Sequence, residues 1–94
     1  MKSRFSERSI RSLTSIWDHI EKDSPEAASR VVGAIVGAAL RLEQFPMSGR
    51  LGRIEGTREL VVPGLPYIIL YSVAEDAILI SAVIHTSRKW PKKL

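Results

Sequence analysis

The sequence predicts an α+β domain in which a helical hairpin packs on one face of a small antiparallel sheet, in the order (β)ααβββ. Two observations carry this prediction. Apolar residues recur at helical spacing through the first half of the chain. After Pro46 the period drops towards two, and short apolar runs alternate with turn residues. Helices and strands that are segregated along the chain are typical of α+β folds. With 94 residues, we expect one domain spanning residues 1–94.

The first quarter of the chain predicts a short strand and a helix. Lys2 to Phe5 form the candidate strand, which would join an edge of the sheet. Ser6 is a good N-cap for a helix from about Glu7 to Lys22. Trp17 belongs to the apolar stripe of this helix, and we expect it in the core. The stripe consists of Ile10, Leu13, Ile16, Trp17 and Ile20.

A second helix should begin directly afterwards. Ser24 can cap it and Pro25 suits its first position, so we expect a helix that runs to about Gln44. Two or three residues separate the two helices, which predicts an antiparallel hairpin.

Two glycines interrupt the second helix. Gly33 and Gly37 each cost about 1 kcal/mol relative to alanine in a helix. We expect these glycines to allow the first helix, or Trp17, to approach the backbone of the second helix closely, which would offset that cost. A membrane helix pair is the other interpretation of this spacing. The charge-free run from Val31 to Leu40 is too short for it, because a spanning helix needs about 20 residues.

The second half of the chain predicts a loop and three strands. The loop covers residues 45–53, and the strands cover Thr57 to Val62, Tyr67 to Val73 and Ile78 to His85. The last two strands are apolar on both faces, which is typical of central positions in a sheet. Helices would cover one face and a partner could cover the other. Tyr67 and Tyr71 are expected in the core.

The charge of the chain is concentrated in its second half. The formal net charge is +4: residues 1–49 hold seven basic and six acidic residues (+1), and residues 50–94 hold seven and four (+3). A basic half indicates a polyanion or an acidic protein as partner. Simple solubility is the alternative explanation.

Several function classes are excluded or disfavoured. The chain has no cysteine, which excludes a disulfide framework and a thiolate metal site. His19 and His85 are far apart in sequence and offer no metal-ligand spacing, so we expect no metal and no other cofactor. The polar segment from Met1 to Ile10 is not a secretory signal, and we expect a cytoplasmic protein.

The order of several segments resembles the RelE/ParE superfamily of toxins, over nearly the whole chain. These segments are residues 16–20, 23–28, 45–50, 56–60, 67–73 and 80–84, followed by His85 and Arg88. The resemblance implies a toxin that an antitoxin encoded beside it neutralises, in a hetero-oligomer and away from membranes. RelE-like members enter the ribosome and cut mRNA. ParE-like members inhibit DNA gyrase and have no known chemistry of their own. An inactive binding relative is a third alternative.

Metal-independent RNA cleavage would need an acid, a base and cationic donors around the phosphate. His85 is the best acid/base candidate, since an imidazole titrates near neutral pH and some nuclease members carry a histidine at this strand end. Arg58 and Arg88 could clamp the phosphate. Glu59, or else Glu55, could act as the base.

Other residues could bind a nucleic acid or a protein partner. Arg50 and Arg53 could hold an RNA backbone, together with Lys89, and Trp90 could stack on a base. Each candidate also has a structural interpretation. Arg50 and Arg53 could dock an acidic antitoxin, and Trp90 could cover the sheet edge.

The catalytic candidates have structural interpretations as well. His85 could simply end a strand with a hydrogen bond to backbone, and Arg58 and Glu59 could pair with their neighbours. One departure weakens the nuclease interpretation. Several nuclease members carry an arginine three residues before the tyrosine that Tyr71 matches, and Ile68 stands there in this chain.

Overall fold

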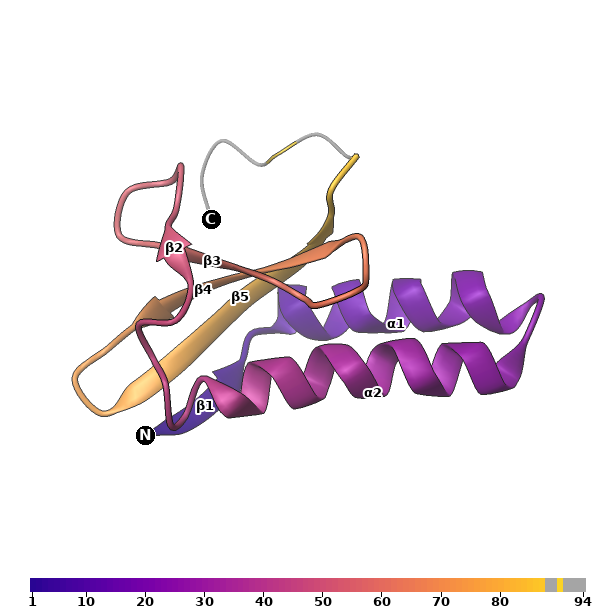
Figure 1. The fold of residues 1–94 in the computed structure, drawn as a ribbon, viewed down its shortest axis with the longest axis horizontal. Coiled ribbons are helices and arrows are strands. Elements are labelled where there is room, and N and C mark those ends of the chain that lie inside the picture. Colours follow the sequence, from indigo (N-terminus) through magenta and orange to yellow (C-terminus); the bar gives the residue numbers. More distant parts are fainter. Residues whose placement is uncertain (88–89, 91–94) are drawn as a thin grey trace.

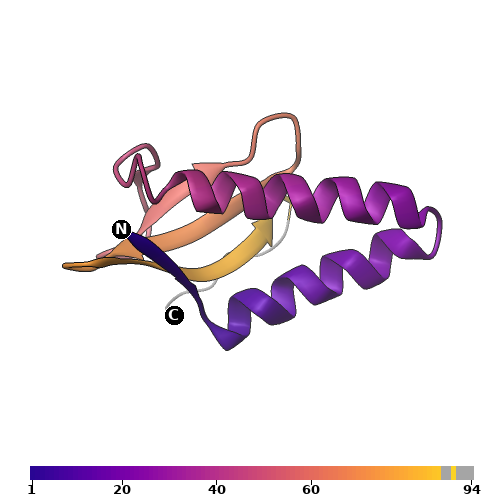
Figure 2. The ribbon, with the colours of Figure 1, turned by 90° about the horizontal axis from the view of Figure 1, so that it is seen from below.

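The structure is a computed structural model, and it describes residues 1–87 and residue 90. In this part of the chain, two helices lie on one face of a five-stranded sheet (Figures 1 and 2). The order agrees with the predicted (β)ααβββ and adds one short strand, β2, inside the predicted loop. In chain order the elements are β1 (Lys2–Phe5), α1 (Glu7–Glu21), α2 (Pro25–Arg41), β2 (Arg50–Leu51), β3 (Arg58–Val61), β4 (Tyr67–Val73) and β5 (Ala77–His85).

Both helices begin where the sequence predicts, because serine side chains cap them. The hydroxyls of Ser6 and Ser24 each accept a hydrogen bond of 3.1 Å from the backbone N–H three residues further on. Pro25 occupies the first turn of α2. This helix ends at Arg41, before the predicted end at Gln44, since residues 42–44 form turns. The two helices run antiparallel, which confirms the predicted hairpin (Figure 2).

The sheet has the order β1-β5-β4-β3-β2. The neighbours from β5 to β2 are antiparallel, but β1 pairs with β5 in parallel. The sheet is therefore mixed, and the prediction of an antiparallel sheet is wrong for its first strand. A tight turn forces two strands to be antiparallel, whereas β1 reaches β5 only after most of the chain has intervened. Its predicted place at a sheet edge is confirmed.

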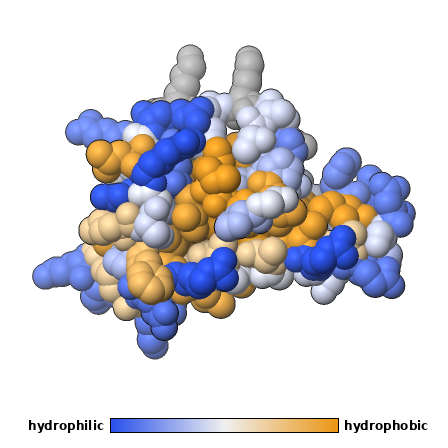
Figure 3. All heavy atoms as spheres, in the orientation of Figure 1, coloured by the Kyte–Doolittle hydropathy of each residue, from blue (hydrophilic) through white to orange (hydrophobic). Residues whose placement is uncertain are grey.

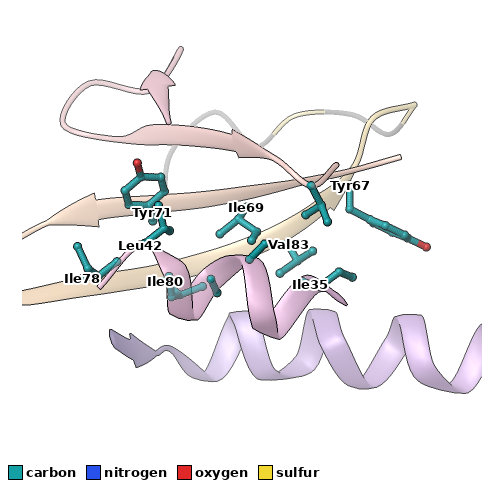
Figure 4. Packing of buried hydrophobic residues seen from close by; sticks show 11 residues of the cluster. Ile35, Leu42, Tyr67, Ile69, Tyr71, Ile78, Ile80 and Val83 are labelled. Carbon is teal, nitrogen blue, oxygen red and sulfur yellow. The ribbon is translucent and has the colours of Figure 1, made fainter. Parts of the chain in front are cut away.

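The core lies between the sheet and the helices, and the two helices share in it unequally (Figure 4). Leu13 and Ile16 of α1 are only partly buried against it. Tyr67 and Tyr71 belong to the core, as predicted, and the Tyr71 hydroxyl points away from the helices in Figure 4. The buried cluster consists of Ile35, Ala38, Ala39, Leu42, Val62, Tyr67, Ile69, Tyr71, Ile78, Ile80 and Val83.

Strands β4 and β5 are also buried on the face that points away from the helices. Side chains alternate between the two faces of a sheet, so Leu70 and Ala82 lie opposite to the core residues Ile69 and Val83. Leu70 is 0% exposed and Ala82 is 2% exposed. The prediction that these two strands take central positions is confirmed.

Two expectations about the helices are wrong. Trp17 is only half-buried, and its indole Nε1 donates a hydrogen bond of 2.9 Å to Glu21. Neither the first helix nor Trp17 closely approaches the glycines of α2. A Cβ atom added at Gly33 would meet nothing within 4 Å, and one at Gly37 would meet the Arg41 guanidinium at 3.8 Å. Periodicity shows that a helix has a small-residue stripe, but not which of its stripes its neighbour covers.

Candidate functional site

Residues 45–53, here called the arginine loop, are held by a buried tyrosine. The Tyr71 hydroxyl donates a hydrogen bond of 2.8 Å to the carbonyl of Pro46 and accepts one of 2.9 Å from the backbone N–H of Gly49. A Cβ atom at Gly49 would lie 2.6 Å from that hydroxyl and 2.9 Å from the carbonyl oxygen of Glu59. The loop can pass this close to β3 and β4 only because residue 49 has no side chain.

Glu59 is the centre of the ionic contacts of this loop. The residue is 3% exposed. Its Oε1 accepts hydrogen bonds from Nη2 and Nε of Arg50 at 3.0 and 3.2 Å. Its Oε2 accepts one from the backbone N–H of Arg53 at 2.8 Å and lies 3.4 Å from the Nε of the same residue. The carboxylate is therefore surrounded by donors.

These contacts set the protonation of Glu59. Burial raises the pKa of this carboxyl, but the backbone N–H of Arg53 and the side chains of Arg50 and Arg53 together outweigh burial and leave the pKa below its usual value. A carboxylate whose pKa is lowered and whose oxygens already accept hydrogen bonds is a poor proton acceptor. The structural interpretation of Glu59, pairing with its neighbours, is the one that the geometry supports.

Arg58 is also engaged with the arginine loop. Its Nη1 donates a hydrogen bond of 2.7 Å to the carbonyl of Gly49, with the carbonyl of Met47 at 3.5 Å. Both acceptors belong to the backbone of the arginine loop. The guanidinium therefore positions the loop, and part of its donor edge is already used.

Trp90 lies under a side chain of the same loop. The guanidinium carbon of Arg53 is 3.8 Å from the centre of the indole ring, which is a close cation–π contact. Arg53 thus joins Glu59 to Trp90. One face of the indole is therefore covered by Arg53. Arg88 and Lys89, the remaining basic candidates, lie outside the described residues.

His85 lies apart from this cluster, at the end of β5. Its Nδ1 accepts a hydrogen bond of 3.1 Å from the backbone N–H of Ser87, whose hydroxyl is 2.8 Å away. The imidazole packs edge-on against Tyr67, with ring centres 5.3 Å apart. These are the contacts of the structural interpretation, a histidine that ends a strand with a bond to backbone.

The strand register separates the catalytic candidates. His85 is opposite Tyr67 on β4, whereas Arg58 is opposite Tyr71 from the other side. Those two positions are four residues apart along β4, which is roughly 13 Å at about 3.3 Å per residue. The fold brings Glu59, Arg50, Arg53 and Trp90 together, and Trp90 also lines the groove beside His85. In the part of the chain that the structure describes, His85 itself makes no hydrogen bond or ion pair with Arg58 or Glu59.

A groove of about 880 Å³ lies beside His85, between α1 and the end of β5. We call it the β5 groove. Its α1 wall is mainly polar, and its other wall is the second half of β5. The walls include Arg8, Ser12, Ser15, His19 and Lys22 of α1 and residues 82–85 of β5.

The surface also carries large apolar side chains. Leu51 is 78% exposed, and Phe45 and Met47 are more than half exposed. On the face seen in Figure 3, apolar residues form an uneven band across the middle, framed by hydrophilic residues. Within residues 1–87 and residue 90, we find no group of three potential metal ligands. In the same residues, neither helix has both the length and the apolarity of a membrane span.

The part played by Tyr71 and Gly49 was not predicted. The signal was present, because a tyrosine in an apolar strand must find a partner for its hydroxyl, and a glycine-flanked loop supplies close backbone. The sequence does not say which loop meets which tyrosine.

Comparison with known proteins gives matches over almost the full length of the chain. A family model described as "ParE toxin of type II toxin-antitoxin system, parDE" matches residues 4–90. The chain is 45% identical to Y4kP of Sinorhizobium fredii over 91 residues, which are 97% of this chain and 94% of that protein. It is 37% identical to toxin RelE2 of Caulobacter vibrioides over 81 residues, 86% of this chain and 90% of that one.

A solved structure has the same fold. It is described as the chromosomal ParDE TA system from P. aeruginosa, and one of its chains superposes with a TM-score of 0.85 at 24% identity. The match covers 93% of this chain and 97% of the other.

Proposed function

Because this chain belongs to the ParE toxin family of type II toxin–antitoxin systems, we propose that it arrests growth by binding DNA gyrase and not by cutting RNA. An antitoxin encoded beside it would be its partner in the resting cell. The proposal makes the chain a binding protein with no reaction of its own.

The separation of the nuclease candidates is the observation that carries this proposal. RNA cleavage needs the acid, the base and the cationic donors around one phosphate. His85 and Arg58 lie at β4 positions roughly 13 Å apart along the strand. Glu59 is held by Arg50 and Arg53, and its lowered pKa suits an ion pair better than proton transfer.

Brief expression of the chain without its antitoxin tests the proposal. We expect translated mRNA to stay intact while DNA damage is induced and cells become filamentous. Site-specific loss of translated mRNA with intact DNA would contradict the proposal and support ribosome-dependent cleavage. Growth without any arrest would support an inactive binding relative.

Removal of the histidine side chain sharpens the same test. We expect His85→Ala to keep its full toxicity, because a binding mechanism needs no acid or base at this position. Arg88→Ala is the companion variant from the nuclease hypothesis. Loss of toxicity in both variants, with circular dichroism showing that the fold is retained, would favour RNA cleavage over gyrase binding.

A further inference from the structure

Exposed apolar side chains are concentrated where α2 passes into the arginine loop. Among the residues that the structure describes, eight large apolar side chains are exposed, and four of them lie within residues 40–51. Phe45 is 62% exposed and Met47 is 60% exposed, and the other two are Leu40 and Leu51. A single exposed apolar side chain is ordinary, but several that fall in one short segment mark a candidate interaction surface.

A hollow of about 220 Å³ lies in the same region, between the end of α2, the start of the arginine loop and the end of β3. We call it the α2 hollow. Its apolar lining is continuous with the core, because Ala38 belongs to the buried cluster and Leu60 packs against that cluster. An apolar side chain placed in the hollow would therefore extend the core. The lining residues are Ala38, Arg41, Phe45, Ser48, Leu60 and Pro63.

The size of the α2 hollow suits a side chain better than a small molecule. Pockets for cofactors and other small molecules have volumes of about 300–1,000 Å³, and this hollow is smaller. Among its described lining residues, Arg41 and Ser48 are the two with polar side chains, so few groups could orient a bound molecule. The hollow thus favours an anchoring side chain that another protein inserts.

The backbone of Phe45 is held from both directions along the chain. Its N–H donates a hydrogen bond of 3.1 Å to the carbonyl of Arg41, and its carbonyl accepts one of 3.1 Å from the N–H of Ser48. Directly after it, the Tyr71 hydroxyl fixes the arginine loop through the two bonds described above. A surface that is fixed before binding loses little conformational entropy when a partner docks. The loop therefore presents its apolar side chains in one prepared arrangement.

Arg41 gives the hollow its charge. It is exposed, and it is the charged residue among the described lining residues. The carboxylate of Glu43, the nearest acidic residue along the chain, is directed to β1, where the N–H and the hydroxyl of Ser3 donate to it at 2.7 and 2.8 Å. The guanidinium of Arg41 is therefore placed to meet a carboxylate of a partner beside the anchoring side chain.

We propose that the α2 hollow, together with Phe45, Met47 and Arg41, is the surface through which the chain holds DNA gyrase. The gyrase surface would supply an apolar side chain that enters the hollow and a carboxylate that pairs with Arg41. The inference rests on the proposed function, because a toxin without a reaction of its own arrests growth through the surface that holds its target.

A second copy of this chain fits the surface less well. In a twofold pair the same patch lies on both sides of the interface. The Arg41 side chains of the two copies would then meet across it without a carboxylate, and like charges brought together weaken an interface. An acidic, apolar surface of a different protein avoids this repulsion.

Inhibition of gyrase supercoiling by variants of the full chain tests the proposal. Phe45→Ser should raise the concentration needed for half inhibition about tenfold, and Arg41→Gln about threefold. Both side chains are exposed, so the melting temperature should stay nearly unchanged. The matched controls are Ile10→Ser, which removes an exposed apolar side chain of α1, and Arg30→Gln, which removes an exposed cation of α2. Both controls should inhibit like the natural chain.

The outcomes separate this inference from the proposed function. Inhibition by the natural chain that neither Phe45→Ser nor Arg41→Gln weakens overturns the α2 hollow as the gyrase surface and leaves gyrase as the target. Absence of inhibition by the natural chain overturns both. Weaker binding of Phe45→Ser to the antitoxin, or loss of a dimer of the natural chain, at unchanged inhibition would assign the surface to that partner instead and overturn the inference.

Photochemical crosslinking gives an independent measurement. The chain has no cysteine, so Met47→Cys introduces a single thiol that takes a benzophenone maleimide at the edge of the proposed surface. On illumination with purified gyrase, this label should form a crosslink to the enzyme. Thr14→Cys, at an exposed position of α1, is the control and should form few crosslinks. Crosslinks that are equally frequent from both positions, or more frequent from residue 14, overturn the inference.

Discussion

The arginine loop and the β5 groove lie at different places on the same sheet, and they differ in how their polar groups are partnered. In the arginine loop, the Glu59 carboxylate, the Tyr71 hydroxyl and the Arg58 guanidinium all find partners within the chain. At the β5 groove, the cationic side chains of Arg8 and Lys22 line the wall of α1 and are exposed to solvent.

This difference indicates that the charged residues of the arginine loop have a structural role, whereas the β5 groove is available to a partner. A buried ion whose hydrogen bonds are complete is typical of a structural cluster, since leaving such groups unpaired is costly. A groove lined by exposed cations attracts an acidic partner. Charge alone, which drew attention to Arg50, Arg53 and Arg58 in the sequence, does not distinguish the two.

The largest expected effect on stability comes from a substitution at the closest contact of the arginine loop. Gly49→Ala places a methyl group against the Tyr71 hydroxyl and the Glu59 carbonyl, and we expect a loss of about 3 kcal/mol from overpacking. Gly33→Ala is the control, because its Cβ would meet nothing within 4 Å, and it should stabilise the helix by roughly 0.5–1 kcal/mol. Urea denaturation measures both. Equal effects would mean that the loop does not pack as described.

The next effect removes the charge at the centre of the loop. Glu59→Gln should lower the free energy of unfolding by about 2 kcal/mol at pH 7, less than for a fully buried pair because Arg50 and Arg53 are half exposed. Glu75→Gln, at an exposed position, should change little.

The pH dependence of this effect has a definite sign. The pKa of Glu59 is lower in the folded chain than its unfolded value of about 4.3. Its contribution is therefore complete above that value and is lost as the pH falls through the folded pKa. The difference between the natural chain and Glu59→Gln should shrink between about pH 5 and pH 3. A difference that grows on acidification would contradict this account of the cluster.

A smaller effect tests the charge of the β5 groove. Arg8→Glu reverses a cation of its wall and should weaken the antitoxin complex about tenfold at low salt, and less at high salt. Arg30→Glu makes the same change on the exposed surface of α2, away from the groove, and should have little effect. Calorimetric titration at two salt concentrations compares them. Equal losses would mean that net charge, and not this wall, attracts the partner.

The smallest effect concerns the contact between the loop and Trp90. Trp90→Leu removes the aromatic face under Arg53 and should cost about 0.5–1 kcal/mol of stability, the range of an exposed cation–π contact. Trp90→Phe should recover part of that loss. Thermal unfolding measures both variants, and a loss that phenylalanine does not reduce would mean that apolar area alone matters.

The features that were predictable from the sequence are those that depend on neighbouring residues. Ser6, Ser24 and Pro25 fix helix starts through bonds within one turn, and the apolar runs of β4 and β5 predict central strands. Periodicity and capping are local, so one sequence is enough to read them.

The features that the sequence predicted wrongly depend on contacts between distant segments. The element that lies beside each of these features decides it: the parallel direction of β1, the absence of a neighbouring helix at the glycines of α2, and the partial burial of Trp17. The candidate site divides in the same way. Glu59 and its arginines are brought together by the pairing of β2 with β3, and His85 is kept apart by the register of β4 and β5.

The inhibition of gyrase supercoiling by the purified chain, beside the His85→Ala variant, tests the central claim most directly. The account predicts that both proteins inhibit at the same concentration, since a binding toxin needs no acid or base. Absence of inhibition by the natural chain, together with cleavage of mRNA on translating ribosomes that His85→Ala abolishes, would contradict it.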